Sequence, residues 1–444
     1  MKESSKPRRE LGLFDAIMIV MGGIVGAGIF ANPSEVAHRV HTPFLMLGVW
    51  VLGGFVAMCG AFIWAELATR LPGTGGQYLY LRQAFHPSVA FVYGWGLLLV
   101  TQTGGMAAVA VIFASYFHAL TGVRWSDGTI AAVVLLMLIG INCLGARAGS
   151  NVQSALMLLK IAAIAALVVV GFAVGGSAIA RLEPGPLLGQ PASLGFLKSI
   201  GAAMVPIAFA YGGWQTATFV AGEMRDERRN LSRGLLIGVA GVVVLYLAVN
   251  LACLRMLGPA GLDATTTPAS DVMRIAFGER GAQWIAVGIA ISTLGFLSQS
   301  MLTAPRVYYA MARDGLFFES VGKLSRRSGA PVVAIVLQGL AAMAIACSGT
   351  YGEILNFEVT VDFIFFGMTA VSLFVVRRRR IGLGNYIYRA PGHPLTTILF
   401  VLSCAGIVGS AIVASPANSA IALGIMLAAL PVYYFWIRFK RAHS

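Results

Sequence analysis

Charged residues are scarce in this sequence. Asp, Glu, Lys and Arg together make up 11% of the chain, whereas soluble globular proteins carry roughly 25%. Hydrophobic residues fill 58% of the 444 positions, which is enough for about a dozen helices at roughly 20 apolar residues per membrane span. The shortage of charge therefore excludes a mostly water-facing protein and leaves no length for a separate soluble domain.

Disulfide, metal-ligand and catalytic patterns are also missing. All five cysteines lie within apolar stretches, and their spacing fits neither a disulfide framework nor a metal site. The sequence has no nucleophile–base pair or phosphate loop of an enzyme and no repeated ring of channel-lining residues. The net charge of +14 is spread between apolar spans rather than gathered on one face, so we expect no nucleic acid partner. We also expect no metal and no cofactor.

Twelve apolar spans can be drawn along the chain, joined by short polar loops. A long apolar run without a small-residue cleavage site follows the charged N-terminus, so it is predicted to be a membrane helix rather than a signal peptide. The uncharged stretch from Ala390 to Ile437 is too long for one crossing, and the turn residues Ser415 to Ser419 divide it. The predicted spans are 12–39, 43–71, 87–120, 128–146, 150–175, 195–222, 233–258, 281–312, 330–349, 352–377, 393–414 and 416–438.

Basic residues indicate how the spans are oriented. When the loops are assigned alternately to the two sides, most of the 32 lysines and arginines fall on one of them, and such an excess marks the cytoplasmic side. The sequence therefore predicts a multi-pass protein of the inner or plasma membrane with cytoplasmic tails at 1–11 and 439–444. Segment 73–86 is predicted to be an amphipathic helix on the cytoplasmic surface, and segment 259–280 to cap the vestibule with a short helix. Either segment could instead be an ordinary connection.

Glycines interrupt the first and sixth spans. Gly22, Gly23, Gly26 and Gly28 fall within one stretch of the first span, where each costs about 0.8–1 kcal/mol relative to alanine in a continuous helix. The sixth span carries a similar interruption between Phe209 and Trp214. Close packing of helices through small residues would explain either run alone. Interruptions at matching positions five helices apart, however, indicate inverted repeats with a binding site at the membrane midplane.

The interruptions also indicate a ligand. Free N–H groups near Gly26 to Gly28, at the positive end of a helix dipole, suit an anion. Carbonyls freed at Ile24, Phe209 and Gly212 would accept hydrogen bonds from an ammonium group. An anion site beside an ammonium site describes the backbone of an α-amino acid.

Three motifs carry a resemblance to a known family: GGIVGAGIF in the first span, FAYGGW in the sixth, and WAELATRLPGTGGQYLY from Trp64 to Tyr80. Together they resemble the amino acid–polyamine–organocation superfamily, and most closely the L-type amino acid transporters and their bacterial relatives. The resemblance implies an all-α membrane protein of twelve transmembrane helices with a LeuT-like fold, in which helices 1 and 6 are broken. Two inverted five-helix repeats would cover 12–175 and 195–377, and two further helices would cover 393–438.

The resemblance also implies roles for individual residues. It places the substrate carboxylate on the amides of Ala27 and Gly28, the substrate amine on the carbonyls of Ile24, Phe209 and Gly212, and the outer lid on the ring of Phe209. The chain differs from the family at Gln215 and Gly222, on the inner side. The substrate-binding residues would be Ile24, Val25, Gly26, Ala27, Gly28, Phe209, Ala210, Tyr211 and Gly212.

Lys160 is the most unusual charge within a span. It lies about ten residues into the fifth span, roughly 15 Å along the helix, and a lysine at that depth is functional or else hydrogen-bonded to backbone carbonyls. The resemblance puts Lys160 where sodium-coupled relatives bind sodium, tying the first span to the eighth, and this implies sodium independence. Its expected partners are the carbonyls freed in the first span, with Ser292 or Thr293 in the eighth. Tyr246 matches a family tyrosine at the inner end of the site. Because a buried lysine can release its proton, both exchange and proton symport stay open.

Two carboxylates lie in the tenth span, where Glu358 and Asp362 share one helix face. They could line the pocket, carry protons or pair with a neighbour. We expect a sodium-independent carrier of small or medium neutral L-amino acids by alternating access, with exchange favoured over proton symport. The alternative is a proton-coupled carrier of cationic amino acids or polyamines that uses these two acids. Loop 120–128 has no cysteine, so we expect no glycoprotein heavy chain; the oligomeric state is open.

Overall fold

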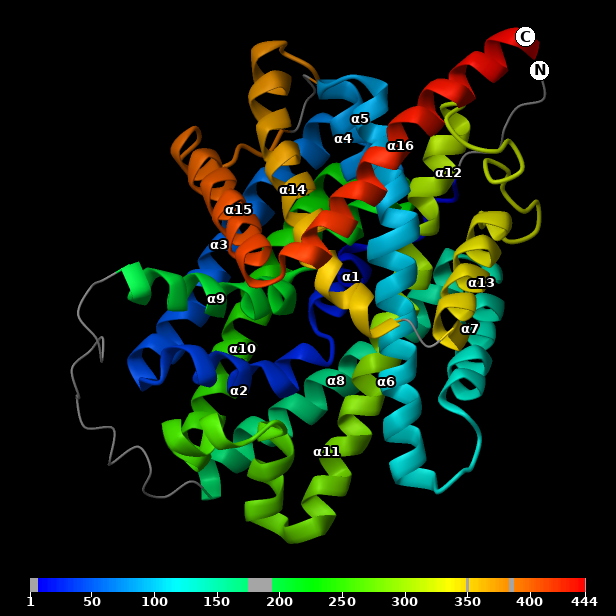
Figure 1. Ribbon diagram of the computed structural model, residues 1–444. Helices are drawn as coiled ribbons and strands as arrows, with labels where there is room; N and C mark the ends of the chain where they lie inside the picture. Colours follow the sequence, from blue (N-terminus) through cyan, green and yellow to red (C-terminus); the bar gives the residue numbers. More distant parts are fainter. Residues whose placement is uncertain (1–6, 175–193, 349–350, 383–386, 444) are drawn as a thin grey trace.

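The computed structural model describes residues 7–174, 194–348, 351–382 and 387–443 (Figure 1). Over these residues the chain is helical, without a β-strand; a single isolated bridge joins Leu11 and Met224. The helices are α1 (Leu13–Ile24), α2 (Gly28–Val40), α3 (Pro43–Arg70), α4 (Gln77–Ala84), α5 (Pro87–Gly96), α6 (Thr103–Thr121), α7 (Asp127–Cys143), α8 (Ala146–Val174), α9 (Leu194–Tyr211), α10 (Glu227–Ala264), α11 (Pro268–Thr303), α12 (Pro305–Arg313), α13 (Val332–Ser348), α14 (Tyr351–Arg378), α15 (Leu395–Ala414) and α16 (Pro416–His443), with a π-helix η1 (Leu97–Gln102) and a 3-10 helix η3 (Trp214–Glu223).

Most of these helices are long and apolar enough to cross a membrane. Within the described residues nine segments meet that test, and the bent pair α1–α2 makes ten if it counts as one span. The apolar helices α7 and α13 are shorter. The prediction of an all-α protein with many membrane spans is therefore confirmed, and the observed helices coincide with the predicted spans to within a few residues at most ends.

The first span is broken as the glycines predict. Residues Val25 to Ala27 separate α1 from α2, which are bent by 42° relative to each other. The sixth span is broken between α9 and η3, where Gly213 has a φ of 100°. Residues that carry a Cβ rarely adopt this backbone conformation. The two breaks touch, because a Cβ on Gly23 would lie 2.5 Å from the carbonyl oxygen of Gly213. Helix interruption and close packing through small residues thus occur together at this point.

Neighbouring helices hold the broken spans in place. Helix α2 of the first span and helix α9 of the sixth pack against each other and lie side by side at the left of the bundle in Figure 1. Helix α1 packs against α10, and α8 runs along α11. Trp214, directly after the second break, packs edge to face against Trp64 of α3 with ring centroids 4.8 Å apart. The break in the sixth span is therefore anchored in the aromatic core.

The two loop segments that the sequence singles out are both helical. Helix α4 forms within segment 73–86 as predicted, with Gln77, Tyr78 and Leu81 on a fully buried face and Gln83 exposed. The Tyr78 hydroxyl donates a hydrogen bond to Asp314 at 3.0 Å, and burial raises the pKa of Tyr78 well above its usual range. Segment 259–280 consists of helical extensions of α10 and α11, which turn at Gly258 and Gly278 with positive φ angles.

Candidate functional site

A cavity of about 220 Å³ lies where the two broken spans meet. It is far larger than the space for a single water molecule, which needs about 10–15 Å³. Most of the residues that the sequence predicts for the site line this cavity: Ile24, Gly26, Ala27, Gly28, Phe209, Ala210, Gly212, Tyr246, Glu358 and Asp362. The remaining predicted residues lie outside its lining: Val25, Lys160, Tyr211, Ser292 and Thr293.

The first break offers hydrogen-bond donors to the cavity. The N–H groups of Gly26, Ala27 and Gly28 have no backbone partner within the described parts of the chain. They stand at the N-terminus of the 13-residue helix α2, where the helix dipole places partial positive charge. These donors therefore suit an anionic group bound in the cavity.

Residues that carry the predicted acceptor carbonyls, from both breaks, line the same cavity. The Ile24 oxygen accepts a hydrogen bond from the Tyr246 hydroxyl at 3.0 Å, and the Phe209 oxygen accepts one from the Gly212 N–H at 3.2 Å. A carbonyl oxygen has a second lone pair, so both can also accept from a bound ammonium group. Acceptors from the two spans thus lie in one cavity with the donors of α2.

Tyr246 of α10 connects the two breaks. Its side chain is fully buried, and its hydroxyl lies 3.0 Å from the Ile24 oxygen and 3.2 Å from the Ala210 oxygen. A single hydroxyl hydrogen is shared between an acceptor at the end of α1 and one at the end of α9. This side chain therefore links the two broken spans directly.

Lys160 of α8 holds the first break from the other side. Its side chain is fully buried, and Nζ donates to the Val25 oxygen at 2.6 Å. Gly295 of α11 makes room for it, since a Cβ there would lie 2.4 Å from Lys160 Cε. Of the two expected partners in α11, Ser292 donates to the Gly26 oxygen at 3.1 Å, whereas Thr293 donates to its own helix at Ala290. Lys160 and Ser292 thus meet at the break itself, and Thr293 does not join them.

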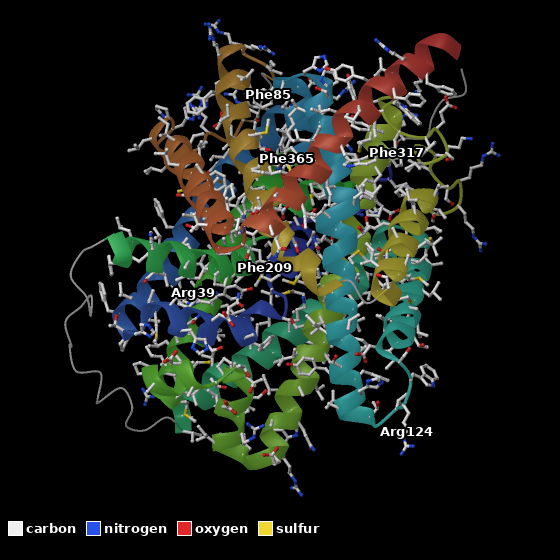
Figure 2. The ribbon with its side chains drawn as sticks, viewed as in Figure 1. Arg39, Phe85, Arg124, Phe209, Phe317 and Phe365 are labelled. Atoms are coloured by element: carbon white, nitrogen blue, oxygen red, sulfur yellow. The ribbon has the colours of Figure 1, made fainter. Side chains whose placement is uncertain are left out.

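Phe209 covers one side of the cavity. Its side chain is 37% exposed, and its ring lies 3.7 Å from where a Cβ on Gly28 would stand. Figure 2 shows Phe209 near the middle of the molecule, between the ends of the bundle. The ring therefore stands directly beside the free N–H groups of α2.

The third span contributes a feature that the sequence analysis missed. It changes from α-helix to π-helix over Leu97–Gln102 before α6 begins, and π-helical turns occur frequently at functional sites. Gln102, at the end of that turn, lines the cavity. The π-helix itself contains no glycine or proline, so the signals in the sequence are the polar run Thr101 to Thr103 and the glycines that flank it.

Comparison with known proteins identifies the family. The family model described as "Amino acid permease" matches residues 11–437 of this chain. The chain belongs to the amino acid permease family. The resemblance drawn from the three sequence motifs is therefore confirmed.

Several curated relatives of this permease match over nearly its whole length. It is 29% identical to the serine/threonine exchanger SteT of Bacillus subtilis, covering 97% of this chain and 98% of the relative. It is 27% identical to the human large neutral amino acids transporter small subunit 2, over 97% and 81% of the two chains. It is 28% identical to the rat b(0,+)-type amino acid transporter 1, over 98% and 89%. These relatives are transporters and not enzymes, and this permease is likewise a multi-pass membrane protein of amino acid transport.

The permease is closed where α1 begins and η3 ends. Leu11 forms a backbone bridge with Met224. The Arg306 guanidinium donates to both carboxylate oxygens of Glu223 at 2.9 and 3.2 Å, and both side chains are buried. Asp15 of α1 accepts from Arg147 at 3.0 Å. The bridge joins the start of α1 to the end of η3, while the two ion pairs join η3 to α12 and α1 to α8. These contacts together close this end of the site.

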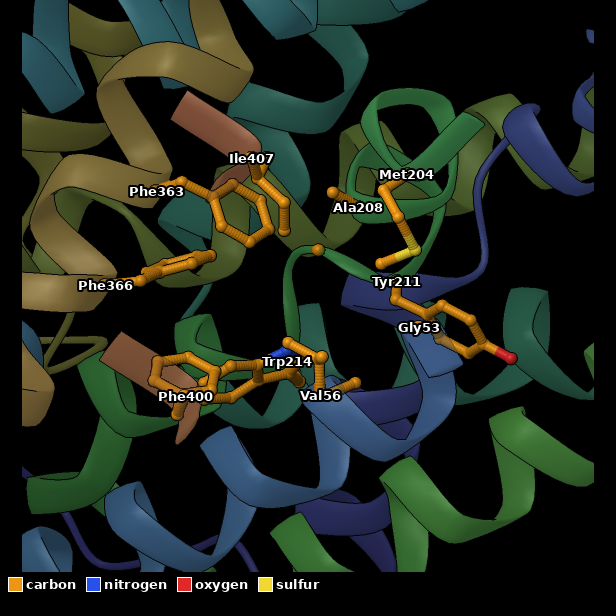
Figure 3. A pocket seen from close by; sticks show the side chains of 12 residues that line it. Gly53, Val56, Met204, Ala208, Tyr211, Trp214, Phe363, Phe366, Phe400 and Ile407 are labelled. Atoms are coloured by element: carbon orange, nitrogen blue, oxygen red, sulfur yellow. The ribbon is translucent and has the colours of Figure 1, made fainter. Parts of the chain in front are cut away.

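A second cavity lies beside the break in the sixth span (Figure 3). It measures about 20 Å³ and shares Ala208, Gly212, Phe363 and Phe366 with the larger cavity. Its walls are mainly apolar, and Figure 3 shows the Tyr211 hydroxyl pointing away from its centre. That hydroxyl donates to the Trp50 oxygen at 3.2 Å. An amino acid backbone would find few partners here, so the polar chemistry belongs to the larger cavity.

Proposed function

We propose that this permease carries L-amino acids by alternating access and binds the α-amino and α-carboxylate groups between its two helix breaks. One observation supports the proposal above all others: donors at the start of α2 and acceptors from both breaks line a single cavity. The α-carboxylate of an amino acid would accept hydrogen bonds from the donors of α2, and its α-ammonium would donate to the carbonyl acceptors of the breaks. Phe209 would cover the substrate as a lid, and Tyr246 would keep the two breaks in register.

We further propose the LeuT-like arrangement that the resemblance implies. The short apolar helices α7 and α13, added to the longer spans, would complete the twelve. The first repeat would cover 12–175, the inverted repeat 195–377, and the last two helices 393–438. The contact between Gly23 and Gly213, each in the broken span of its own repeat, supports this pairing. The closed end at Leu11 would then face the cytoplasm, as would both termini, and the chain would work without a heavy chain.

For energetics we propose sodium-independent exchange rather than proton symport. The ammonium group of Lys160 lies on a break carbonyl, where it would supply the positive charge that a sodium ion supplies elsewhere. One relative is itself named an exchanger. A fixed cation that tethers the first span needs no ion gradient.

The substrate side chain admits two candidates. The expectation of a neutral side chain rests on the first, third, sixth and eighth spans, which bring no carboxylate to the pocket. Helix α14 of the tenth span brings two, Glu358 and Asp362. This observation favours the second candidate, a cationic side chain.

Counterflow in proteoliposomes tests the function. Purified permease is reconstituted into vesicles loaded with one L-amino acid, and uptake of the same radiolabelled amino acid is measured for each of the twenty. We expect uptake only with internal substrate, and the same rate in sodium and choline buffers. Concentrative uptake into empty vesicles under an inward proton gradient would contradict exchange, and uptake of none of the amino acids would contradict the function.

A further inference from the structure

Two carboxylates face the cavity without any partner of their own. Glu358 and Asp362 lie one turn apart on α14, and both line the cavity. Neither has a hydrogen bond or ion pair with any residue that the structure describes. Among the described lining residues there is also no lysine, arginine or histidine. The cavity therefore holds two acids and no basic side chain.

The chain itself does not supply the missing positive charge. A carboxylate removed from water needs a cation or several hydrogen-bond donors to remain ionised. The buried Lys160 does not line the cavity, and its ammonium group already donates a hydrogen bond to the Val25 oxygen at 2.6 Å. The counter-charge for the two acids must therefore come from a ligand or from protons.

A third acceptor faces the same part of the cavity. Gln102 is only 8% exposed, lines the cavity, and its side-chain oxygen has no hydrogen-bond partner among the described residues. Gly105, nearly one turn further, faces α14 directly, because a Cβ there would lie 3.3 Å from Glu358 Oε2. The third span thus brings a buried amide oxygen without a partner to the cavity that the acids line. Three acceptors at one place suit a donor-rich cation.

The walls between the acids and the helix breaks suit a hydrocarbon stem. Phe209, Phe296 and Phe363 line the cavity along with aliphatic side chains. Methylene groups would pack on these surfaces, and an aromatic face also attracts a cation close to it. An amino acid with its α-groups at the breaks and a charged side-chain end at α14 would satisfy both ends of the cavity.

We propose that Glu358, Asp362 and Gln102 form a subsite for the positively charged side chain of an L-amino acid. This proposal rests on the proposed function, because it assumes that the α-amino and α-carboxylate groups are held at the helix breaks. Substrates of this class carry a side-chain ammonium or guanidinium group. The subsite selects them by charge, while the breaks select the amino acid backbone.

The test compares L-lysine with L-norleucine, which has the same carbon chain without the terminal ammonium. Both compete for uptake of a labelled substrate into proteoliposomes containing the full chain. We expect lysine to compete at least about tenfold better, the range of charge-assisted hydrogen bonds. In the Glu358→Gln/Asp362→Asn variant, lysine should lose that advantage and norleucine should change little. The control Glu319→Gln, which alters an exposed acid, should behave as the parent.

The outcomes separate this subsite from the function on which it rests. Equal or better competition by norleucine in the parent would overturn the subsite and leave the transporter intact, and this comparison needs no variant to fold. Norleucine accumulation under an inward proton gradient, abolished in Glu358→Gln, would assign the acids to protons instead. Failure of every α-amino acid to exchange would overturn the proposed function as well. The single variants Glu358→Gln and Asp362→Asn show how much each acid contributes to the advantage of lysine over norleucine. Each is compared with the parent only if it elutes like the parent on size exclusion, which shows that it is folded.

Discussion

Removing one hydroxyl group from Tyr246 should uncouple the two helix breaks. Its oxygen lies 3.0 Å from the Ile24 carbonyl oxygen and 3.2 Å from the Ala210 carbonyl oxygen. In Tyr246→Phe the ring remains, but both buried carbonyls lose their donor. A buried hydrogen bond contributes about 1 kcal/mol, and an acceptor left unsatisfied costs about 1–3 kcal/mol. Together we expect about 2 kcal/mol, or about a thirtyfold change in any equilibrium that depends on the register of the breaks.

The assay is counterflow in proteoliposomes, alongside the thermal unfolding midpoint of the purified protein. We expect Tyr246→Phe to lower the exchange rate about tenfold or more, with a modest fall in the midpoint. Tyr78→Phe is the matched control, since Tyr78 is also fully buried and donates at 3.0 Å to Asp314, which belongs to neither break. It should lower the midpoint similarly and leave exchange nearly unchanged. Equal exchange rates for Tyr246→Phe and the parent would refute the reasoning.

Three further variants test other contacts of the breaks, and each is measured by counterflow. Lys160→Met should lower exchange at least about tenfold, because it removes a charge-assisted hydrogen bond to Val25; exchange that persists unchanged would contradict the tether. Gly295→Val should have a similar effect by displacing Lys160, whereas Gly48→Val, with no atom within 4 Å of its added Cβ, should not. Phe209→Ala should reduce turnover far more than equilibrium binding, since occlusion is a step of the cycle; unchanged turnover would exclude Phe209 as a lid.

Much of the fold could be predicted from the sequence because a membrane helix is recognised from its own residues alone. Twenty apolar residues in a row define a span whatever its neighbours are, and glycine clusters at Gly22–Gly28 and Gly212–Gly213 mark breaks by their own helix propensity. The helix at 77–84 could be predicted for the same reason. The contacts of its buried face could not, because they depend on distant residues such as Asp314.

The site was less predictable where it depends on contacts between distant segments. Sequence spacing indicates that Glu358 and Asp362 share a face, but not that the face lines the cavity opposite Gln102. The π-helical turn that ends at Gln102 contains no glycine or proline, and the glycines that flank it do not by themselves predict a change of helix type. The bond from Lys160 to a freed carbonyl of the first span could be expected, but which of Ser292 and Thr293 reaches the break depends on how α8 and α11 cross at Gly295.

Ligand binding to the purified permease tests most directly whether the helix breaks hold an α-amino acid. Thermal shift is measured with an L-amino acid that exchanges, with the amine that lacks its carboxylate, and with the acid that lacks its amine. Donors at Gly28 and acceptors at Ile24 predict that only the complete amino acid stabilises the protein, and that Gly28→Val, which would crowd Asn32 and Phe209, abolishes the shift. Equal stabilisation by the amine alone would contradict the account.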